Sequence, residues 1–198
     1  MSGPASSRAM AHPDWDALYE AATAQAGHFT TAQAAQAGYS GPLLHKHRRA
    51  GRIRRVQRGI YRLVHYPPTE HEEFVAHWLW SARAGVFSHQ TALALHGLSD
   101  LLPMRVHLTL PASWAERRLR IPKGLVLHFS DIQRKSRSWA GPVPLTVPER
   151  TLEDCAAIGL APDLLRQAAR QALDRSLVSR TSLSGVRSAL RAFGGLKG

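Results

Sequence analysis

Apolar side chains recur at helical spacing near the start of the chain. Trp15, Leu18, Tyr19 and Ala22 occupy positions i, i+3, i+4 and i+7. This spacing places them on one face of an amphipathic helix. Gly27 follows as the residue that ends the helical pattern. The chain is therefore predicted to open with a helix that packs through one apolar face.

Two shorter helices are predicted by their capping residues. Thr30, with Gln33 three residues later, has the pattern of a capping box, which predicts a helix over residues 31–37. Ser40 is suited to cap a third helix over about residues 42–50. Two short helices joined by a turn that contains glycine are typical of a helix–turn–helix.

The segment after the third helix changes to an alternating pattern. Residues 52–56 and 60–64 are predicted as two strands, with Gly59 in the turn between them. The alternation is imperfect at residues 54–55, so a β-bulge or a shifted register stays open. A hairpin directly after the third helix corresponds to the wing of a winged helix–turn–helix.

Beyond the hairpin, the pattern mixes helices with strands. Residues 67–68 are both proline and predict a boundary, which gives a flexible tail (1–12), a winged helix–turn–helix domain (13–66) and a C-terminal domain (67–198). In the last of these we expect helices at 74–82, 88–96, 162–173 and 181–193, a helix between a capping box at 146–149 and Gly159, and strands at 105–110, 125–129 and 143–145. The predicted fold class is α+β, a winged helix–turn–helix followed by a mixed α/β domain with a helical C-terminus.

Positive charge is concentrated in the predicted third helix and hairpin. The chain has a net charge of +12, which favours polyanionic partners. Residues 46–62 contain eight Lys and Arg, and no Asp or Glu lies between Ala21 and Thr69. No apolar run approaches the ~20 residues that span a bilayer, and the N-terminus does not resemble a signal peptide. We therefore expect a cytoplasmic protein that makes no membrane contact.

The basic residues have the positions expected of a DNA-binding surface. The polar side chains of residues 45–49 lie within about one helical turn, where Lys and Arg can donate to guanine in the major groove. Ser40 can donate to a phosphate at the helix N-terminus, and the hairpin arginines can reach the flanking backbone or the minor groove. A solvated basic surface and RNA binding remain the alternatives. The predicted DNA-binding residues are Ser40, His45, Lys46, Arg48, Arg49, Arg52, Arg54, Arg55 and Arg58.

Candidate catalytic and metal-binding residues do not have the required spacing. Ser88 and His89 are adjacent, and neighbours on a helix do not face each other, so Ser88 is interpreted as a helix N-cap. His71, Glu72 and His77 match no set of ligands on one helix face. The remaining histidines are scattered. We therefore predict no catalytic residues, no metal ligands and no cofactor.

Eight short motifs follow one another in a recognisable order. They are residues 27–31, 37–40, 51–56, 58–63, 87–98, 106–111, 124–128 and 148–154. In this order and spacing the sequence resembles the AbiEi family of type IV antitoxins, over roughly residues 15–172. The resemblance implies a winged-helix domain followed by an antitoxin domain.

The resemblance also implies a function and its partners. Such proteins repress their own operon by binding inverted repeats in the double-stranded DNA of the promoter, and they counteract a nucleotidyltransferase-like toxin. Whether the antitoxin and the toxin form a stable complex stays open. A protein that is monomeric in solution could still bind the inverted repeat as a dimer. Some relatives carry an added nuclease-like domain, which we expect to be absent here because the chain ends near residue 198.

Two other functions are compatible with the residues. One is a stand-alone winged-helix transcriptional regulator with a C-terminal sensing or dimerisation domain, and the other is an enzyme that acts on nucleic acid. The C-terminal domain has two further basic clusters, at residues 117–123 and 134–137. They could extend the DNA footprint, contact a toxin or its RNA substrate, or lie in solvated loops.

Overall fold

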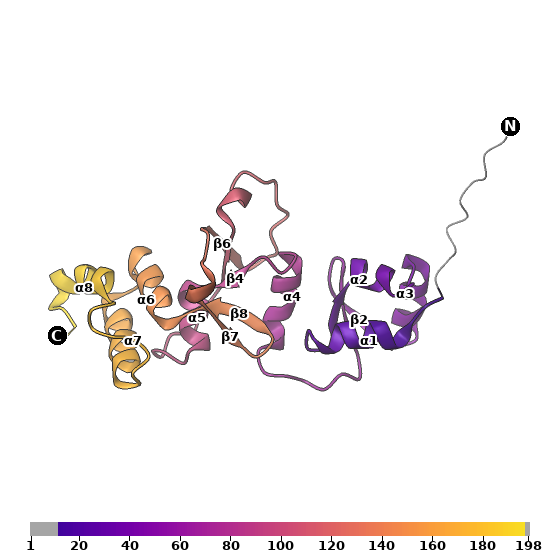
Figure 1. The fold of residues 1–198 in the computed structure, drawn as a ribbon, viewed down its shortest axis with the longest axis horizontal. Helices are drawn as coiled ribbons and strands as arrows, with labels where there is room; N and C mark the ends of the chain where they lie inside the picture. The colour runs from indigo at the N-terminus through magenta and orange to yellow at the C-terminus, as the bar shows by residue number, and fades with distance from the viewer. Residues whose placement is uncertain (1–11, 197–198) are drawn as a thin grey trace. The chain divides into compact units, whose positions relative to one another are not determined.

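The computed structural model describes residues 12–196, so nearly all of the predicted tail lies outside the described residues. The chain divides into two compact units, one ending at Trp80 and the other starting at Ser81 (Figure 1). Helices and strands occur in both units. The predicted α+β class, with a winged helix–turn–helix followed by a mixed α/β unit, is confirmed.

The first unit combines four helices with a small antiparallel sheet. Its elements are α1 (Trp15–Thr23), β1 (His28–Thr30), α2 (Thr31–Gln36), α3 (Gly41–Arg49), β2 (Ile53–Gln57), β3 (Ile60–Leu63) and α4 (Glu72–Trp80). The strand order is β1-β3-β2, so β2 is an edge strand. Strand β1 was not predicted, because three residues are too few to show an alternating pattern.

Local capping bonds begin α2 where the sequence predicts. The Thr30 side chain accepts from the Gln33 backbone N–H at 3.2 Å, and the Gln33 side chain accepts from the Thr30 N–H at 2.9 Å. The predicted capping box is therefore confirmed. The apolar faces of the helices and strands form one buried cluster, which comprises Leu18, Ala22, Phe29, Ala34, Ala37, Tyr39, Leu44, Ile53 and Leu63.

The β2–β3 hairpin turns at Gly59, as predicted. Gly59 has φ +75°, a left-handed conformation that glycine adopts without steric cost. The β2–β3 register shifts between Arg55 and Gln57, which confirms the irregularity left open from the sequence. The Thr31 backbone N–H donates to the Gly59 carbonyl at 2.9 Å, so the hairpin turn is fixed to the start of α2.

The first unit continues past the predicted boundary at residue 66. Helix α4 packs on β1 and β3 and belongs to this unit. Arg62 on β3 donates to the Glu72 carboxylate at 2.6 Å. The two prolines at 67–68 interrupt secondary structure, but the chain then returns to the same sheet. The compact unit therefore ends at Trp80.

The second unit is built on a mixed sheet. Its elements are β4 (Val86–Phe87), α5 (His89–Leu95), β5 (Val106–Leu110), β6 (Leu125–Phe129), β7 (Arg137–Ala140), β8 (Val143–Thr146), α6 (Pro148–Ala157), α7 (Pro162–Asp174), α8 (Ser184–Leu190), and the 3-10 turns η1 (Ala112–Trp114), η2 (Arg134–Ser136) and η3 (Arg191–Phe193). The strand order is β6-β5-β4-β8-β7. The β5–β6 and β4–β8 pairs are parallel, and the other two pairs are antiparallel.

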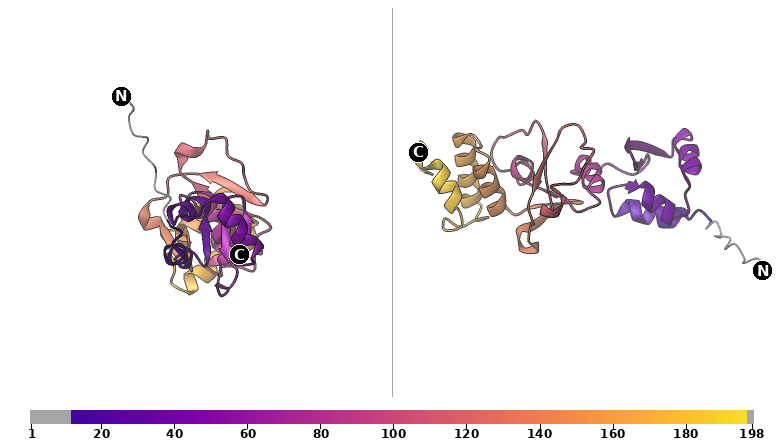
Figure 2. Two further views of the ribbon diagram at one scale, coloured as in Figure 1. Left: turned by 90° about the vertical axis from the view of Figure 1, so that its right-hand side faces the viewer. Right: turned by 90° about the horizontal axis from the view of Figure 1, so that it is seen from above.

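Helices cover part of this sheet and form the C-terminal end of the chain. Helix α5 packs on β5, β8 and α6, and α6, α7 and α8 pack on one another (Figure 2). The predicted capping box at residues 146–149 is wrong, because the N-cap of α6 is Val147 and the Thr146 hydroxyl hydrogen-bonds that of Thr151 at 2.7 Å. Over residues 12–196, no helix combines the length and apolar character needed to cross a bilayer.

Candidate nucleic-acid interface

Helix α3 is held in place by one buried leucine. Leu44 is 2% exposed and lies in the core of the first unit, and Leu43 packs against the same cluster. The side chains of His45, Lys46 and Arg48 are exposed. The helix therefore presents its polar residues to solvent while its apolar side fixes its orientation.

His47 is only partly exposed, unlike the other polar residues of α3. Its ring stacks on Trp15 at 5.8 Å and meets Tyr39 edge-on at 5.4 Å, measured between ring centroids. Burial lowers the pKa of His47, and the nearby charges of Arg52 and Lys46 lower it further. His47 is therefore a neutral packing residue rather than a cationic contact for phosphate.

The start of α3 has the features of a phosphate-binding N-terminus. Ser40 is the N-cap, with extended backbone angles (φ −72°, ψ 162°), and its side chain is exposed. Within the described residues its hydroxyl forms no capping bond to the helix. Because the first backbone N–H groups of a helix also lack partners inside it, both kinds of donor are available at this end.

The end of α3 carries a small polar cluster. One Arg48 guanidinium nitrogen lies 3.4 Å from Nδ1 of His45, one helical turn earlier. Arg49 is exposed beside it. Two of the α3 residues that the sequence predicted as DNA contacts, His45 and Arg48, therefore lie side by side.

The wing supplies the second part of the predicted surface. Ile53 is buried, whereas Arg54, Arg55 and Val56 are all exposed. A regular strand would turn alternate side chains inward, and the register shift after Arg55 removes that alternation. Arg52 and Arg58, at the two ends of β2, are also exposed. All four predicted wing arginines therefore face solvent.

Arg62 is the exception in the basic run. It is 4% exposed and donates to the Leu63 and Pro67 carbonyls at 3.1 and 3.2 Å, besides its 2.6 Å bond to Glu72. Its charge is therefore neutralised inside the first unit. Arg62 contributes to the charge density of the sequence but not to the exposed basic surface.

The basic clusters of the second unit lie mostly in loops. Arg117 lies over the ring of Trp114, with its guanidinium carbon 4.3 Å from the ring centroid. Arg137 donates twice to the Ile132 carbonyl, at 2.8 and 3.1 Å. These two arginines therefore have local structural partners.

Ser88 and His89 are in contact, contrary to the prediction from helical spacing. The Ser88 hydroxyl lies 2.9 Å from Nδ1 of His89 and 2.7 Å from the Thr109 hydroxyl. His89 has φ +51°, so its backbone departs from helical geometry and its ring turns back toward Ser88. Ser88 itself is 0% exposed.

One family model matches part of the first unit. The family model for "Transcriptional regulator, AbiEi antitoxin" matches residues 16–64, which confirms the predicted resemblance over the winged helix–turn–helix. That description is of a regulator rather than of an enzyme, and it supports a DNA-binding protein of the antitoxin kind.

Among solved structures, the crystal structure of the RV2827C protein from Mycobacterium tuberculosis is similar to this chain, with a TM-score of 0.46 and 17% identity. The alignment covers 86% of this chain and 73% of that protein. Comparison with curated protein sequences gave no match.

Proposed function

We propose that the chain binds double-stranded DNA with α3 in the major groove and the β2–β3 wing on the flanking backbone. The observation that carries this proposal is an exposed basic surface, free of acidic residues, over a helix fixed by the buried Leu44. The residues proposed to contact DNA are Ser40, His45, Lys46, Arg48, Arg49, Arg52, Arg54, Arg55 and Arg58.

The two parts of this surface have different roles. Lys46, Arg48 and Arg49 would contact base edges, each good contact adding about 1–3 kcal/mol of discrimination. The wing arginines and Ser40 would contact phosphates. Neutralising four phosphates with the four wing arginines gives a log–log dependence of affinity on salt with a slope of roughly −4.

The protein would act as an antitoxin of a type IV toxin–antitoxin system in the cytoplasm. It would repress its own operon by binding inverted repeats in the promoter, and counteract a nucleotidyltransferase-like toxin. The family match over residues 16–64 and the order of the sequence motifs support this proposal. A solution monomer can satisfy an inverted repeat when two copies bind it.

A mobility-shift experiment with the promoter of its own operon tests the DNA proposal. The full chain would be compared with the triple variant Arg48→Ala, Arg49→Ala, Arg58→Ala at two salt concentrations. The control removes the same charge from exposed arginines of the second unit, in the variant Arg180→Ala, Arg187→Ala, Arg191→Ala. The first variant should lose specific binding and the control should retain it. Intact binding by the first variant would show that the proposed face is wrong.

Growth rescue tests the antitoxin proposal separately. Co-expression of the full chain with the nucleotidyltransferase-like protein of the same operon should restore growth. The DNA-binding variant should still rescue when both genes are under an independent promoter, because we assign antitoxicity to the second unit. Failure of the unaltered chain to rescue would leave a stand-alone regulator as the better interpretation.

A further inference from the structure

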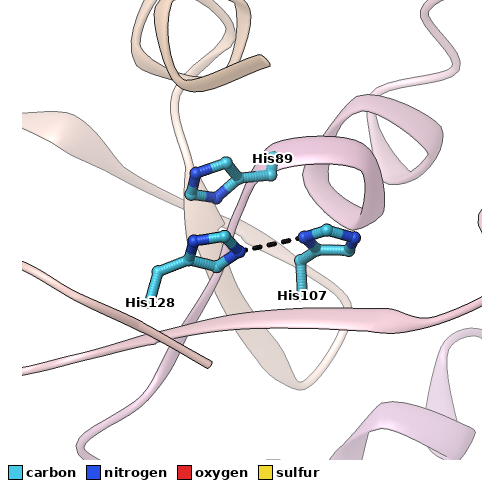
Figure 3. Close-up of side chains that lie close together, drawn as sticks. All are labelled: His89, His107 and His128. Carbon is cyan, nitrogen blue, oxygen red and sulfur yellow. Dashed lines mark hydrogen bonds between the residues drawn. The ribbon is translucent and has the colours of Figure 1, made fainter. Parts of the chain in front are cut away.

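Three histidines that are far apart in the sequence meet in the second unit. His89, His107 and His128 each offer one ring nitrogen within 4.8 Å of the others (Figure 3). Nδ1 of His107 lies 3.0 Å from Nε2 of His128, and the His89 ring stacks on that of His128 with centroids 3.5 Å apart. The prediction of no metal ligands therefore overlooked a cluster that only the fold assembles.

Each histidine comes from a different element of the same unit. His89 is the first residue of α5, His107 is on β5, and His128 is on the neighbouring parallel strand β6. The Thr91 hydroxyl accepts from the His107 backbone N–H at 2.8 Å, which fixes α5 to β5 beside the cluster. Hydrogen bonds thus hold the backbone around the three rings.

The environment keeps the three rings uncharged at neutral pH. Burial, followed by the neighbouring histidines and Arg150, lowers the pKa of His89 to about 3. Burial, His128 and Arg105 lower the pKa of His107 to about 4. Burial also lowers the pKa of His128, although the Asp154 carboxylate opposes the shift. Neutral imidazoles have the free lone pairs that metal coordination requires.

We propose that His89, His107 and His128 bind one divalent transition-metal ion, with Zn²⁺ the best match. Three imidazole nitrogens suit Zn²⁺ and similar ions, whereas Mg²⁺ and Ca²⁺ prefer oxygen ligands. Zn–N bonds of about 2.0–2.1 Å in tetrahedral geometry set the ligand nitrogens about 3.3 Å apart. The His107–His128 pair is already near this separation, and the ion would replace the hydrogen bond between these two nitrogens. The His89 ring lies parallel to that of His128 and would rotate to bring its nitrogen to the ion.

The second observation is a buried carboxylate that interacts electrostatically with one histidine of the cluster. Arg150 donates to Oδ1 of Asp154 at 2.7 Å, while Oδ2 is buried and has no hydrogen-bond partner among residues 12–196. The Asp154 charge acts on His128. A carboxylate outside the ligand set commonly orients a metal-bound histidine and offsets the charge of the ion. Asp154 is therefore assigned as a carboxylate that would offset the charge of the bound ion.

Zn²⁺ titration of the full chain tests the proposal. The protein is stripped with EDTA and dialysed, and Zn²⁺ affinity is measured by competition with a chromogenic chelator. We expect one tightly bound ion per chain. His107→Asn and His128→Asn should each weaken binding by more than about 100-fold, and Asp154→Asn by about 10-fold. The control His65→Gln removes an exposed histidine of the first unit and should leave the affinity unchanged.

Two further measurements keep the proposal falsifiable if the variants fold poorly. At free Zn²⁺ about 100-fold above Kd, the unaltered chain should gain about 10 °C in the Tm of the second unit. Co²⁺ in place of Zn²⁺ should give the visible absorption of a tetrahedral nitrogen site. The proposal is overturned if Zn²⁺ causes no thermal shift, or if His65→Gln weakens binding as much as the cluster variants do.

Discussion

The ion pair between Arg62 and Glu72 makes a sharp prediction about stability. Their side chains are 5% and 22% exposed, respectively, and the contact is 2.6 Å long. Glu72→Ala removes this contact together with the bond from the Thr69 N–H at 3.1 Å. It leaves the Arg62 charge buried without its carboxylate. Losing one partner of a buried pair costs about 3–5 kcal/mol, and the partial exposure of Glu72 favours the lower value, about 3 kcal/mol.

Thermal unfolding followed by circular dichroism measures this effect. For a unit of this size, about 3 kcal/mol corresponds to a fall in Tm of roughly 10–20 °C. The matched control is Glu73→Ala, which removes an exposed carboxylate one residue away and should change Tm by only a few degrees. Equal Tm values for the two variants would refute the argument that Arg62 depends on Glu72.

The same ion pair predicts a pH dependence with a defined sign. Burial alone would raise the pKa of Glu72, but the hydrogen bonds from Arg62 and Thr69 and the charge of Arg62 hold it below its usual value. A carboxylate with a lowered folded-state pKa stabilises the protein above its ordinary pKa. That contribution is lost as pH falls through the lowered value. The stability difference between the unaltered chain and Glu72→Ala should therefore be complete at neutral pH and shrink below about pH 4.

Four further substitutions separate structural roles from binding roles. Arg54→Ala should reduce the salt slope of DNA binding by about one without changing Tm. Arg62→Met should change Tm and leave the salt slope unchanged. DNA titrations at four salt concentrations, together with thermal melts, check both predictions. Gly59→Ala should cost about 1 kcal/mol in urea unfolding, because φ is +75° there and the added Cβ meets only Thr31 Oγ1 at 3.6 Å; an unchanged midpoint would contradict the strain argument. Leu44→Ala should cost about 2–5 kcal/mol in the same assay, since it opens a cavity beneath α3.

Arg54 and Arg62 show where charge patterns fail to predict exposure. The two residues face each other across the β2–β3 ladder and belong to the same basic run. One is exposed and the other is buried, because only Arg62 has a carboxylate ten residues later on α4. The sequence boundary at residue 66 separated these partners. The density of positive charge was therefore predictable from the sequence. The burial of Arg62 was not, because it depends on a contact with Glu72 on α4.

Local signals predicted the helices of the first unit for a physical reason. The Thr30–Gln33 capping box spans one turn, so its residues are neighbours in the sequence and in space. The short strands β1 and β4 have three and two residues, and their pairing partners lie elsewhere in the chain. Their formation depends on those partners rather than on a pattern of their own. This is why the winged helix–turn–helix was predicted without one of its three strands.

The histidine cluster could not be found by spacing. Its members lie on α5, β5 and β6, and the parallel pairing of β5 with β6 brings His107 close to His128. Ser88 and His89 are neighbours in the sequence, and their contact was also missed. Helical geometry was assumed for both, but His89 has φ +51°. A positive φ at a non-glycine residue is a feature that often marks functional sites, and here it directs a ring into the cluster.

No Asp or Glu lies between Ala21 and Thr69, so no acidic side chain of this segment repels DNA. A basic surface attracts any DNA duplex through its phosphates, whatever its sequence. Under the proposed function, direct discrimination among sequences would come from a rigid element that holds donors against base edges. In the first unit α3 meets this requirement, because Leu44 is buried and His47 is packed between Trp15 and Tyr39. The wing, on an edge strand with an irregular register, is better suited to phosphate contacts that tolerate small displacements.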